Sequence, residues 1–312
     1  MAFFLFINSI IFDIIKSSKK IMTIEIYKDK NTKFETNDFL KKIFDFVLIP
    51  ILNSLPKSFQ PGIKKTHKAA GKIIETATSY NALEVLYGHG KMYKSRNLLQ
   101  VFFRWVWLTR NNAKAVRNRL VVVENELRKA VNNLIKKSEN INLLSIASGS
   151  ARAIVESFAR VNVPESIDVS ISFLDKSENA LEYSKRLALS LPNKFFTRWI
   201  EDTASNFPKY FHDENKPNII EMVGLLDYFD NEKVQSIFKI IYDNMQIGGT
   251  FITASIVDNS ERKFVTNVVG WKMIYREPKI IFELAKKAGF KEENIKIFFE
   301  PLKIHFVMIA KK

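Results

Sequence analysis

The second half of the chain alternates short apolar runs with helix-like patterns. Seven runs rich in β-branched and aromatic residues predict strands at residues 142–147, 168–174, 195–200, 218–223, 249–256, 294–299 and 303–310. Apolar residues spaced three and four positions apart predict helices near 151–161, 177–190, 205–212, 230–245 and 278–288. Strands that alternate with helices form a parallel sheet. Because only residues 300–302 separate the last two strands, they form a hairpin and the last strand lies antiparallel.

The first half of the chain is mainly helical by the same criteria. The pattern predicts a short strand at 21–27, an amphipathic helix at 38–55, an exposed loop at 56–71 and two helices within 97–137 that part at Asn111 and Asn112. We therefore expect an α/β fold with a helical N-terminal lobe at residues 1–140 and a second domain at 141–312.

Residues 1–15 are very apolar. They lack the basic first residues of a signal peptide and carry Asp13 within the apolar run, which argues against a signal peptide. They are also too short to cross a bilayer as a helix. We expect a helix that packs on the body of the protein, with a peripheral membrane contact as the alternative.

A turn of small residues follows the first strand of the second domain. Residues 145–151 read SIASGSA, so Gly149 lies between Ala147 and Ala151, and a helix pattern follows. Such a turn lets backbone N–H groups approach a nucleotide or a carboxylate closely. The second strand ends on Asp175, where an acid can accept hydrogen bonds from both ribose hydroxyls. The alternative is that Asp175 or Ser177 only caps the next helix.

The order of these elements resembles the class I S-adenosylmethionine-dependent methyltransferases over about 170 residues. The resemblance implies a Rossmann-like, seven-stranded sheet with an antiparallel last strand, and S-adenosylmethionine as the cofactor. It implies that the first turn holds the methionine end, that the second and third strand ends hold the ribose and adenine, and that the fourth lies beside the methyl group. The implied cofactor residues are Ser145, Ala147, Ser148, Gly149, Ser150, Asp175, Lys176, Glu201, Asp202, Glu221, Met222 and Gly224.

Three departures from that family pattern bear on the substrate and the cofactor. Ser145 replaces the usual acid, and Ala147 and Ala151 replace two glycines. The fourth strand is followed by GLLDYF, residues 224–229, in place of Asn/Asp-Pro-Pro-Tyr. That motif is typical of enzymes that methylate planar amino groups, so its absence makes nucleobases and glutamine less expected as substrates.

The segments RNR (117–119), SIASGSAR (145–152), GLLDYF and GWKMIYREP (270–278) are also similar to bacterial methyltransferases that form methyl esters of hydroxy fatty acids. This resemblance implies a carboxylate acceptor, which needs mainly to be positioned. The candidate substrate residues are Arg117, Arg119, Trp271, Tyr275 and Arg276, because arginine binds carboxylates bidentately and the other residues follow the fifth strand. Three of them have a purely structural alternative, which is a solvated helix face for Arg117 and Arg119 and core packing for Trp271.

Candidate catalytic residues are few. His89 lies between two glycines in a loop that could cover a site, and Asp227 and Tyr228 lie after the fourth strand. An idle surface histidine and a helix-capping turn are the alternatives. The four histidines show no metal-ligand spacing, and the absence of cysteine excludes thiolate sites, so we expect no metal.

The basic charge is concentrated in the N-terminal lobe. Residues 1–140 hold 25 basic and 11 acidic side chains, whereas residues 141–312 hold 23 and 22. We expect a cytoplasmic methyltransferase that acts on a small-molecule or lipid-like acceptor, with O-methylation of a carboxylate or hydroxyl. Two alternatives stay open: an RNA methyltransferase whose basic lobe binds phosphates, and a non-catalytic membrane- or partner-binding protein that kept the fold after its cofactor turn degenerated.

Overall fold

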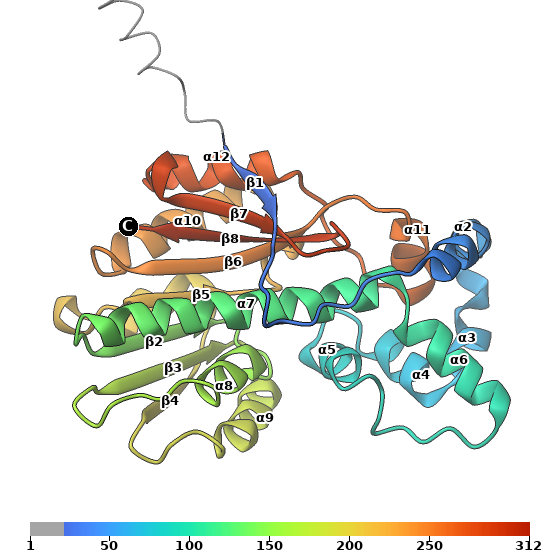
Figure 1. Ribbon diagram of the computed structural model, residues 1–312, viewed down its shortest axis with the longest axis horizontal. Coiled ribbons are helices and arrows are strands. Elements are labelled where there is room, and N and C mark those ends of the chain that lie inside the picture. The colour runs from blue at the N-terminus through green and yellow to red at the C-terminus, as the bar shows by residue number, and fades with distance from the viewer. Residues whose placement is uncertain (1–21) are drawn as a thin grey trace, which may run out of the picture.

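A single mixed sheet organises the computed structural model, which describes residues 22–312 (Figure 1). Its eight strands lie in the order β1-β7-β8-β6-β5-β2-β3-β4. They are β1 (Ile24–Ile26), β2 (Ile141–Ile146), β3 (Val169–Asp175), β4 (Phe196–Glu201), β5 (Ile219–Met222), β6 (Thr250–Ile256), β7 (Ile295–Phe299) and β8 (His305–Lys311). Only β8 is antiparallel to its neighbours, β6 and β7. The predicted Rossmann-like sheet with its antiparallel last strand is confirmed.

The sheet has one strand more than the predicted seven. Strand β1 comes from the N-terminal part of the chain and pairs in parallel with β7, with Ile24 opposite Ile297. The short strand expected at 21–27 therefore extends the edge of the methyltransferase sheet. The expected helix at residues 1–15 lies outside the described residues.

The helices match most of the predicted ranges within a few residues. They are α2 (Phe39–Ser54), α3 (Gln60–Thr66), α4 (Lys68–Glu75), α5 (Tyr80–Tyr87), α6 (Leu98–Leu108), α7 (Asn111–Lys136), α8 (Arg152–Phe158), α9 (Glu178–Ala188), α10 (Asn231–Asn244), α11 (Arg262–Phe264) and α12 (Pro278–Ala288). Short 3₁₀ helices are η1 (Lys57–Phe59), η2 (Ala204–Tyr210), η3 (Asp213–Asn215), η4 (Leu226–Tyr228) and η6 (Glu292–Asn294), and η5 (Val265–Val269) is a π-helix. The helix predicted near 205–212 is thus the 3₁₀ helix η2.

The expectation of an exposed loop at 56–71 is wrong, because η1, α3 and the first half of α4 occupy it. Pro61 lies in the first turn of α3, where its missing N–H breaks no helical hydrogen bond. Gly71 faces the carbonyl oxygen of Lys64 so closely that an added β-carbon would lie 3.0 Å from it. Pro61 is therefore compatible with the start of α3, and Gly71 allows α4 to approach α3 closely.

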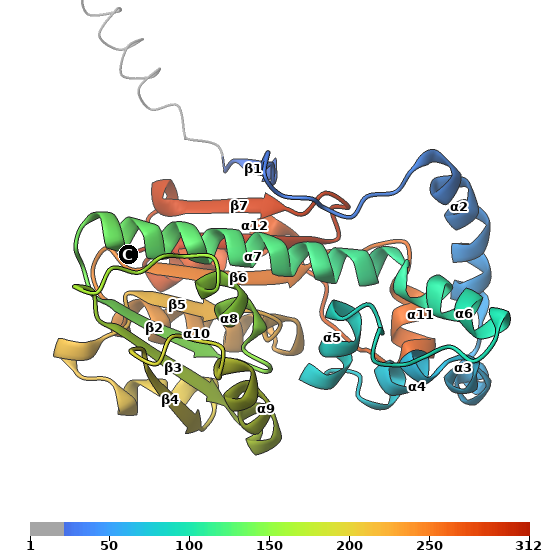
Figure 2. The same ribbon diagram turned by 60° about the horizontal axis from the view of Figure 1, so that its bottom comes forward.

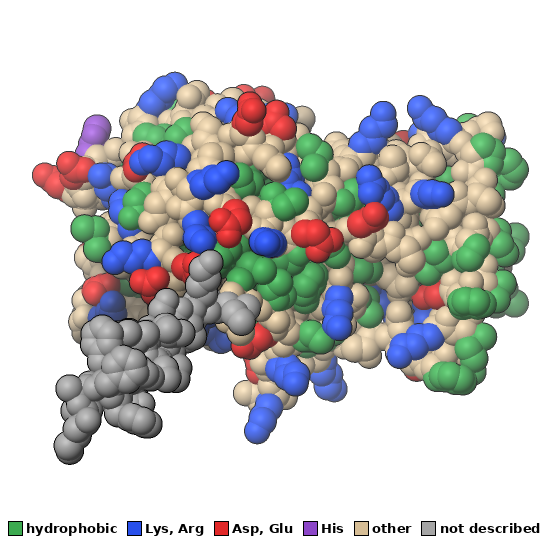
Figure 3. Space-filling model, turned by 90° about the horizontal axis from the view of Figure 1, so that it is seen from above, with side chains coloured by type: hydrophobic (Ala, Val, Ile, Leu, Met, Phe, Trp, Pro, Cys, Tyr) green, Lys and Arg blue, Asp and Glu red, His purple; other side chains and the backbone are tan. Residues whose placement is uncertain are grey.

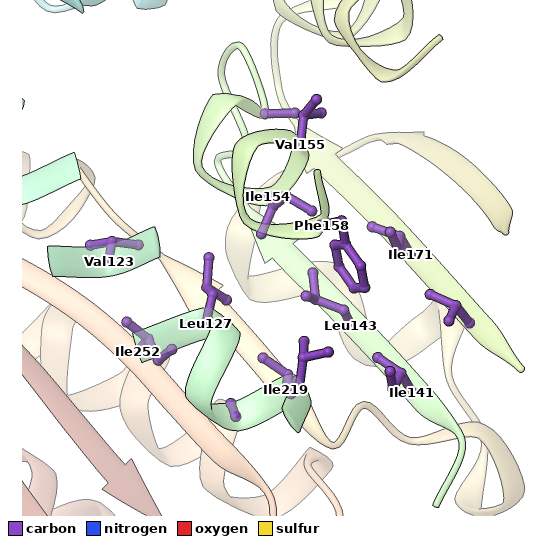
Figure 4. Packing of buried hydrophobic residues seen from close by; sticks show 14 of the residues in the cluster. Val123, Leu127, Ile141, Leu143, Ile154, Val155, Phe158, Ile171, Ile219 and Ile252 are labelled. Carbon is purple, nitrogen blue, oxygen red and sulfur yellow. The ribbon is translucent and has the colours of Figure 1, made fainter. Parts of the chain in front are cut away.

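The core has two layers, one on each face of the sheet. Along β2, Ile141 and Leu143 face α7 and α8, whereas Leu144 and Ile146 face α10 and α12. Figure 4 shows Leu127 of α7 beside Ile219 and Ile252 of the sheet. Each fully buried side chain of this size contributes roughly 1.5–3 kcal/mol.

The helical lobe α2–α6 lies beyond the carboxyl ends of the parallel strands, as Figures 1 and 2 show. Helix α7 packs on α8, β6 and β8 and runs from the sheet into this lobe. The division of the chain at residue 140 stays a prediction. Among residues 22–312, no helix combines the length and apolar composition needed to cross a bilayer.

Candidate active site

The small-residue turn after β2 has an unusual backbone. Ala147, Gly149 and Ala151 all have positive φ, at 53°, 53° and 60°. These are the positions where the family pattern has glycine, and the two alanines adopt the left-handed conformation that glycine adopts without strain. The turn has therefore kept its shape although two glycines are absent.

Asp175 binds this turn from the end of β3. One carboxylate oxygen accepts a hydrogen bond from the Gly149 N–H at 2.9 Å, and the other accepts one from the Ser177 N–H at 2.9 Å. Ser177 itself caps α9 through the Ala180 N–H at 3.4 Å. Asp175 therefore lies at the turn and orders it, while its contact with a ribose stays a prediction.

A first cavity, of about 60 Å³, opens over the turn between β2, β5, α5 and α8. We call it the turn cavity. Ser145, Ala147, Ser148, Gly149, Ser150 and Glu221 of the predicted set line it, together with Tyr80 and Tyr87 of α5. The Ser148 hydroxyl is buried and has no hydrogen-bond partner among the described residues. The turn cavity thus contains an unsatisfied polar group.

Glu221 lies at the bottom of the turn cavity. Its carboxyl accepts a hydrogen bond from the Ser145 hydroxyl at 2.6 Å. Burial raises the pKa of Glu221 to about 7, although Ser145 and the Arg119 guanidinium act in the opposite direction. Ser145 therefore stands in the usual place of an acid, while Glu221 supplies a carboxyl to the same site.

The predicted cofactor residues outside the turn cavity are placed differently. Lys176 and Glu201 are exposed, and the Asp202 carboxylate accepts hydrogen bonds from Asn206 at 2.7 Å and Tyr210 at 2.9 Å. Met222 points into the core, and only its carbonyl oxygen is engaged, by Thr253 at 2.6 Å. Gly224, with a φ of 84°, lines a second cavity.

This second cavity, of about 80 Å³, lies between the carboxyl ends of the strands and the helical lobe. We call it the lobe cavity. Most of its lining is apolar and comes from α4–α7, η5, α11 and the residues after β6: Ile73, Leu83, Leu86, Trp107, Ala113, Val116, Ile256, Phe264, Val265, Val269, Trp271 and Met273. Leu83 lines both cavities, so they adjoin.

Arg119 is one of two buried cations that line the lobe cavity, and the other, Arg110, is paired with Asp45. Its side chain is about 4% exposed, and its Nε has no hydrogen-bond partner among residues 22–312. The guanidinium lies close enough to Glu221, Asp227 and Tyr87 to lower the pKa of each, although burial raises all three pKa values more. Arg119 thus lies where the two cavities meet.

Asn112, Glu261, Asp227 and Tyr228 are further polar residues that line the lobe cavity. Asp227 accepts hydrogen bonds from the Ser255 hydroxyl at 2.6 Å and the Ile256 N–H at 3.3 Å. The Tyr228 oxygen accepts one from Trp271 Nε1 at 2.7 Å, and burial raises the pKa of Tyr228 to about 12. Tyr228 therefore keeps its own proton to donate.

His305 also lines the lobe cavity and was not among the predicted site residues. It is about 2% exposed, and its Nδ1 has no partner among the described residues. Burial and the Arg119 charge hold the pKa of His305 well below its usual value, so the ring is neutral. Its position could have been anticipated: the start of an antiparallel last strand lies at the carboxyl edge of the parallel strands, here opposite Ile256.

Four of the eight predicted substrate and catalytic residues lie outside both cavities. Arg117 forms an ion pair with Glu35 and donates to the Leu108 carbonyl at 2.7 Å. Arg276 donates to the Leu226 carbonyl at 2.9 Å and to Asn231 at 2.8 Å. The Tyr275 ring stacks under the Arg262 guanidinium, and His89 is exposed near Glu35. The structure brings together Arg119, Asp227, Tyr228 and Trp271 of the predicted substrate and catalytic residues.

The strand order, the left-handed turn after β2 and the antiparallel β8 define the class I methyltransferase fold. Residues 102–312 match the family model described as "Putative methyltransferase", and the chain belongs to this family. The prediction of a class I S-adenosylmethionine-dependent methyltransferase is confirmed by this match and the fold. No curated protein sequence matches the chain. Within residues 22–312, no group of acidic and histidine side chains is arranged to hold a metal ion.

Solved structures share the fold at low sequence identity. A possible exported protein from Bordetella parapertussis is 14% identical with a TM-score of 0.60, and the match covers 76% of this chain and 80% of that one. Magnesium protoporphyrin IX methyltransferase from Synechocystis PCC 6803, solved with bound SAH, is 8% identical with a TM-score of 0.50, and the match covers 72% and 93%. These similarities concern the fold.

Proposed function

We propose that the chain transfers the methyl group of S-adenosylmethionine to a carboxylate oxygen of a small, apolar or lipid-like acid. The turn cavity would hold the methionine end of the cofactor, and the lobe cavity would hold the acceptor. In this proposal the N-terminal lobe shapes the acceptor site, because α4, α5 and α6 supply much of its apolar lining.

The residues of the turn cavity fit the cofactor. The left-handed turn lines this cavity, and the Ser148 hydroxyl is buried without a partner among residues 22–312. Buried polar groups are rarely left unsatisfied, so a ligand with a carboxylate or an amino group suits this place. When bound, S-adenosylmethionine supplies an electrophilic methyl group on a sulfonium. The Synechocystis neighbour is solved with SAH, which supports this assignment.

The observation that carries the acceptor proposal is the buried Arg119. A guanidinium in an apolar cavity is costly unless an anion or several acceptors compensate it. Its carboxyl neighbours compensate it only in part, because burial raises the pKa of Glu221 to about 7 and that of Asp227 as well. An anionic group on an otherwise apolar acceptor would match both the charge and the lining of the lobe cavity.

The proposed reaction needs little acid or base chemistry. A carboxylate is already the nucleophile, so the protein has to hold one oxygen in line with the methyl group, and positioning alone can supply roughly 7–11 kcal/mol of the barrier. Arg119 would bind the carboxylate, and the Tyr228 hydroxyl would donate to it. The apolar lining would exclude water from the reacting atoms.

The proposal is tested by a radiolabel assay with medium-chain fatty or aromatic acids, each paired with its alcohol and its primary amide. Arg119→Gln should lower kcat/KM for the acids by about 10- to 150-fold, since a charge-assisted hydrogen bond contributes roughly 1.5–3 kcal/mol. Arg119→Lys keeps the charge but loses the bidentate geometry, so its kcat/KM should lie between those of the parent and Arg119→Gln. S-adenosylmethionine affinity by calorimetry is the control and should stay within about threefold.

Methylation of the alcohols instead of the acids would contradict a carboxylate acceptor. That outcome would favour the hydroxyl alternative, in which His305 takes the proton, because its ring is neutral and its Nδ1 has no partner among residues 22–312. Equal activity of Arg119→Gln and the parent on acids would remove the assigned role of the guanidinium.

A further inference from the structure

Helix α2 has its apolar face toward solvent. Phe39, Leu40 and Phe46 are about 75%, 76% and 83% exposed, and Ile43, Val47 and Ile51 are about half exposed. These residues recur at helical spacing, so they form one continuous stripe along α2. The opposite, charged face is buried.

Buried charges hold α2 in this orientation. Lys41 and Asp45 are about 8% and 4% exposed, and they form an ion pair one helical turn apart. Arg110, about 3% exposed, lies 2.9 Å from the same Asp45 oxygen. Rotating α2 to bury its apolar stripe would break this buried network, and separating one member of a buried ion pair is strongly destabilising. The outward apolar stripe is therefore built into the fold.

Helix α6 adds a second exposed apolar stripe beside the first. Leu98 and Leu99 are about 88% and 62% exposed, and Val101, Phe102 and Trp105 are more than two fifths exposed. Phe44 of α2 and Trp105 of α6 lie 5.5 Å apart between ring centroids, so the two helices adjoin. Eleven of the twenty large apolar side chains exposed in residues 22–312 lie on these two helices. We call this surface the α2–α6 face; Figure 3 shows apolar side chains gathered at that end.

The charge around the α2–α6 face is strongly positive. Residues 39–110 contain twelve lysines and arginines and only three acids. Two of the acids, Asp45 and Glu84, are buried in ion pairs, whereas seven of the cations are exposed: Lys42, Lys57, Lys65, Lys68, Lys91, Lys94 and Arg96. An exposed apolar face with aromatic residues, on a lobe rich in exposed lysine, fits the interface of an anionic bilayer.

We infer that the α2–α6 face docks on an anionic lipid surface, with its apolar side chains among the acyl chains and its cations at the headgroups. The opposite side of α6 supports this occupant, since Trp107 lines the lobe cavity. One helix thus separates the surface from the acceptor site. An apolar acceptor that partitions into the bilayer would then lie close to that site, but the docking itself does not depend on the proposed reaction.

The test is co-sedimentation of the full chain with vesicles of phosphatidylcholine alone and with about 30% phosphatidylserine. We expect binding to the anionic vesicles at least about tenfold tighter, and weaker at high salt. A variant with Phe46→Ser, Leu98→Ser and Leu99→Ser should lose at least about tenfold in affinity. A matched variant with Leu189→Ser and Ile247→Ser removes equally exposed side chains elsewhere, about 83% and 92% exposed, and should bind like the parent.

Three outcomes would overturn the inference. First, the chain could bind neither kind of vesicle. Second, the α2–α6 variant could bind as tightly as the parent, which would assign the binding to another part of the chain. Sedimentation velocity could instead show a dimer that the same variant disrupts, which would make a second copy the partner of this face. Methyltransferase activity on a soluble short-chain acid, measured without vesicles, should be the same in all these variants, so failure of the docking and failure of the proposed function are separable.

Discussion

The strained turn after β2 allows a quantitative test of the site. Ala147 has a φ of 53° and is only partly buried. A residue with a β-carbon pays roughly 1–2 kcal/mol in the left-handed region, and glycine pays none of it. Glycine loses roughly 0.5–1 kcal/mol more chain entropy on folding, which offsets part of the gain. We therefore expect Ala147→Gly to stabilise the protein by about 1 kcal/mol.

Ala151 is the matched control for this substitution. Its φ of 60° implies the same strain, but its methyl group is about 3% exposed and packs in the core of the sheet. Removing a buried methyl group costs about 0.8 kcal/mol. This cost cancels the relief of strain, so Ala151→Gly should leave the stability within about 0.5 kcal/mol of the parent.

Thermal unfolding followed by circular dichroism measures the difference. A gain of 1 kcal/mol corresponds to a rise in Tm of about 2 °C for a chain of this size. S-adenosylmethionine affinity, measured in parallel by calorimetry, should not decrease in Ala147→Gly, because the turn keeps its conformation and loses only a methyl group. A lower Tm for Ala147→Gly, or equal gains for the two variants, would refute the assignment of strain to the turn.

Three further predictions concern single side chains. Asp175→Asn should weaken S-adenosylmethionine binding by roughly 1.5–3 kcal/mol, measured by calorimetry, because charge-assisted hydrogen bonds are lost; unchanged affinity would count against the ribose role. Burial raises the pKa of Glu221 from 4.5 to about 7, so folding favours the protonated form and stability should fall by up to about 3 kcal/mol as the pH rises from 4.5 through 7. In Glu221→Gln, denaturant titrations over this pH range should lose that slope. His89→Ala should leave kcat/KM within about twofold, since His89 is exposed outside both cavities; a loss of more than about tenfold would place it in the site.

The sheet could be predicted from the sequence because its strands are buried on both faces and bounded by helices. Burial on both faces gives apolar runs such as residues 142–147, and the short link at 300–302 leaves a hairpin as the only connection. The turn residues were identified by the resemblance to the methyltransferase family, and the backbone shows the two alanines in glycine-like conformations. Strand β1 was predicted as a strand, but nothing local indicates that it pairs with β7.

The candidate substrate arginines show what a linear motif cannot separate. Arg117 and Arg119 are two residues apart, which is about 200° of rotation in a helix, so they face opposite sides of α7. Both were predicted as substrate residues, yet Arg117 binds Glu35 and Arg119 faces the lobe cavity. Helical geometry alone excludes a joint role, but which arginine faces the site depends on how α7 lies on the sheet.

The orientation of α2 shows the limit of amphipathic patterns. A stripe of apolar residues predicts a helix but not the direction in which the stripe faces. Here Asp45 finds Arg110, which is 65 positions later in the chain, and this pairing turns the apolar stripe outward. The Asp45–Arg110 ion pair thus determines which face of α2 is buried, and no local sequence pattern indicates this contact.

Helix α7 explains how the lobe and the site are coupled. One face of α7 contributes Val123 and Leu127 to the core of the sheet. At its start, the N–H groups of Asn111 and Asn112 donate hydrogen bonds to the Glu261 carboxylate. A negative side chain at a helix N-terminus is favourable, so this contact fixes α7 against the segment after β6. Arg119 lies between these two attachments and therefore has little freedom to move toward solvent. A guanidinium held in this way can take a counter-charge only from groups that enter the cavity or already line it, and this restriction is the basis for the proposed role of Arg119 in binding an anionic acceptor.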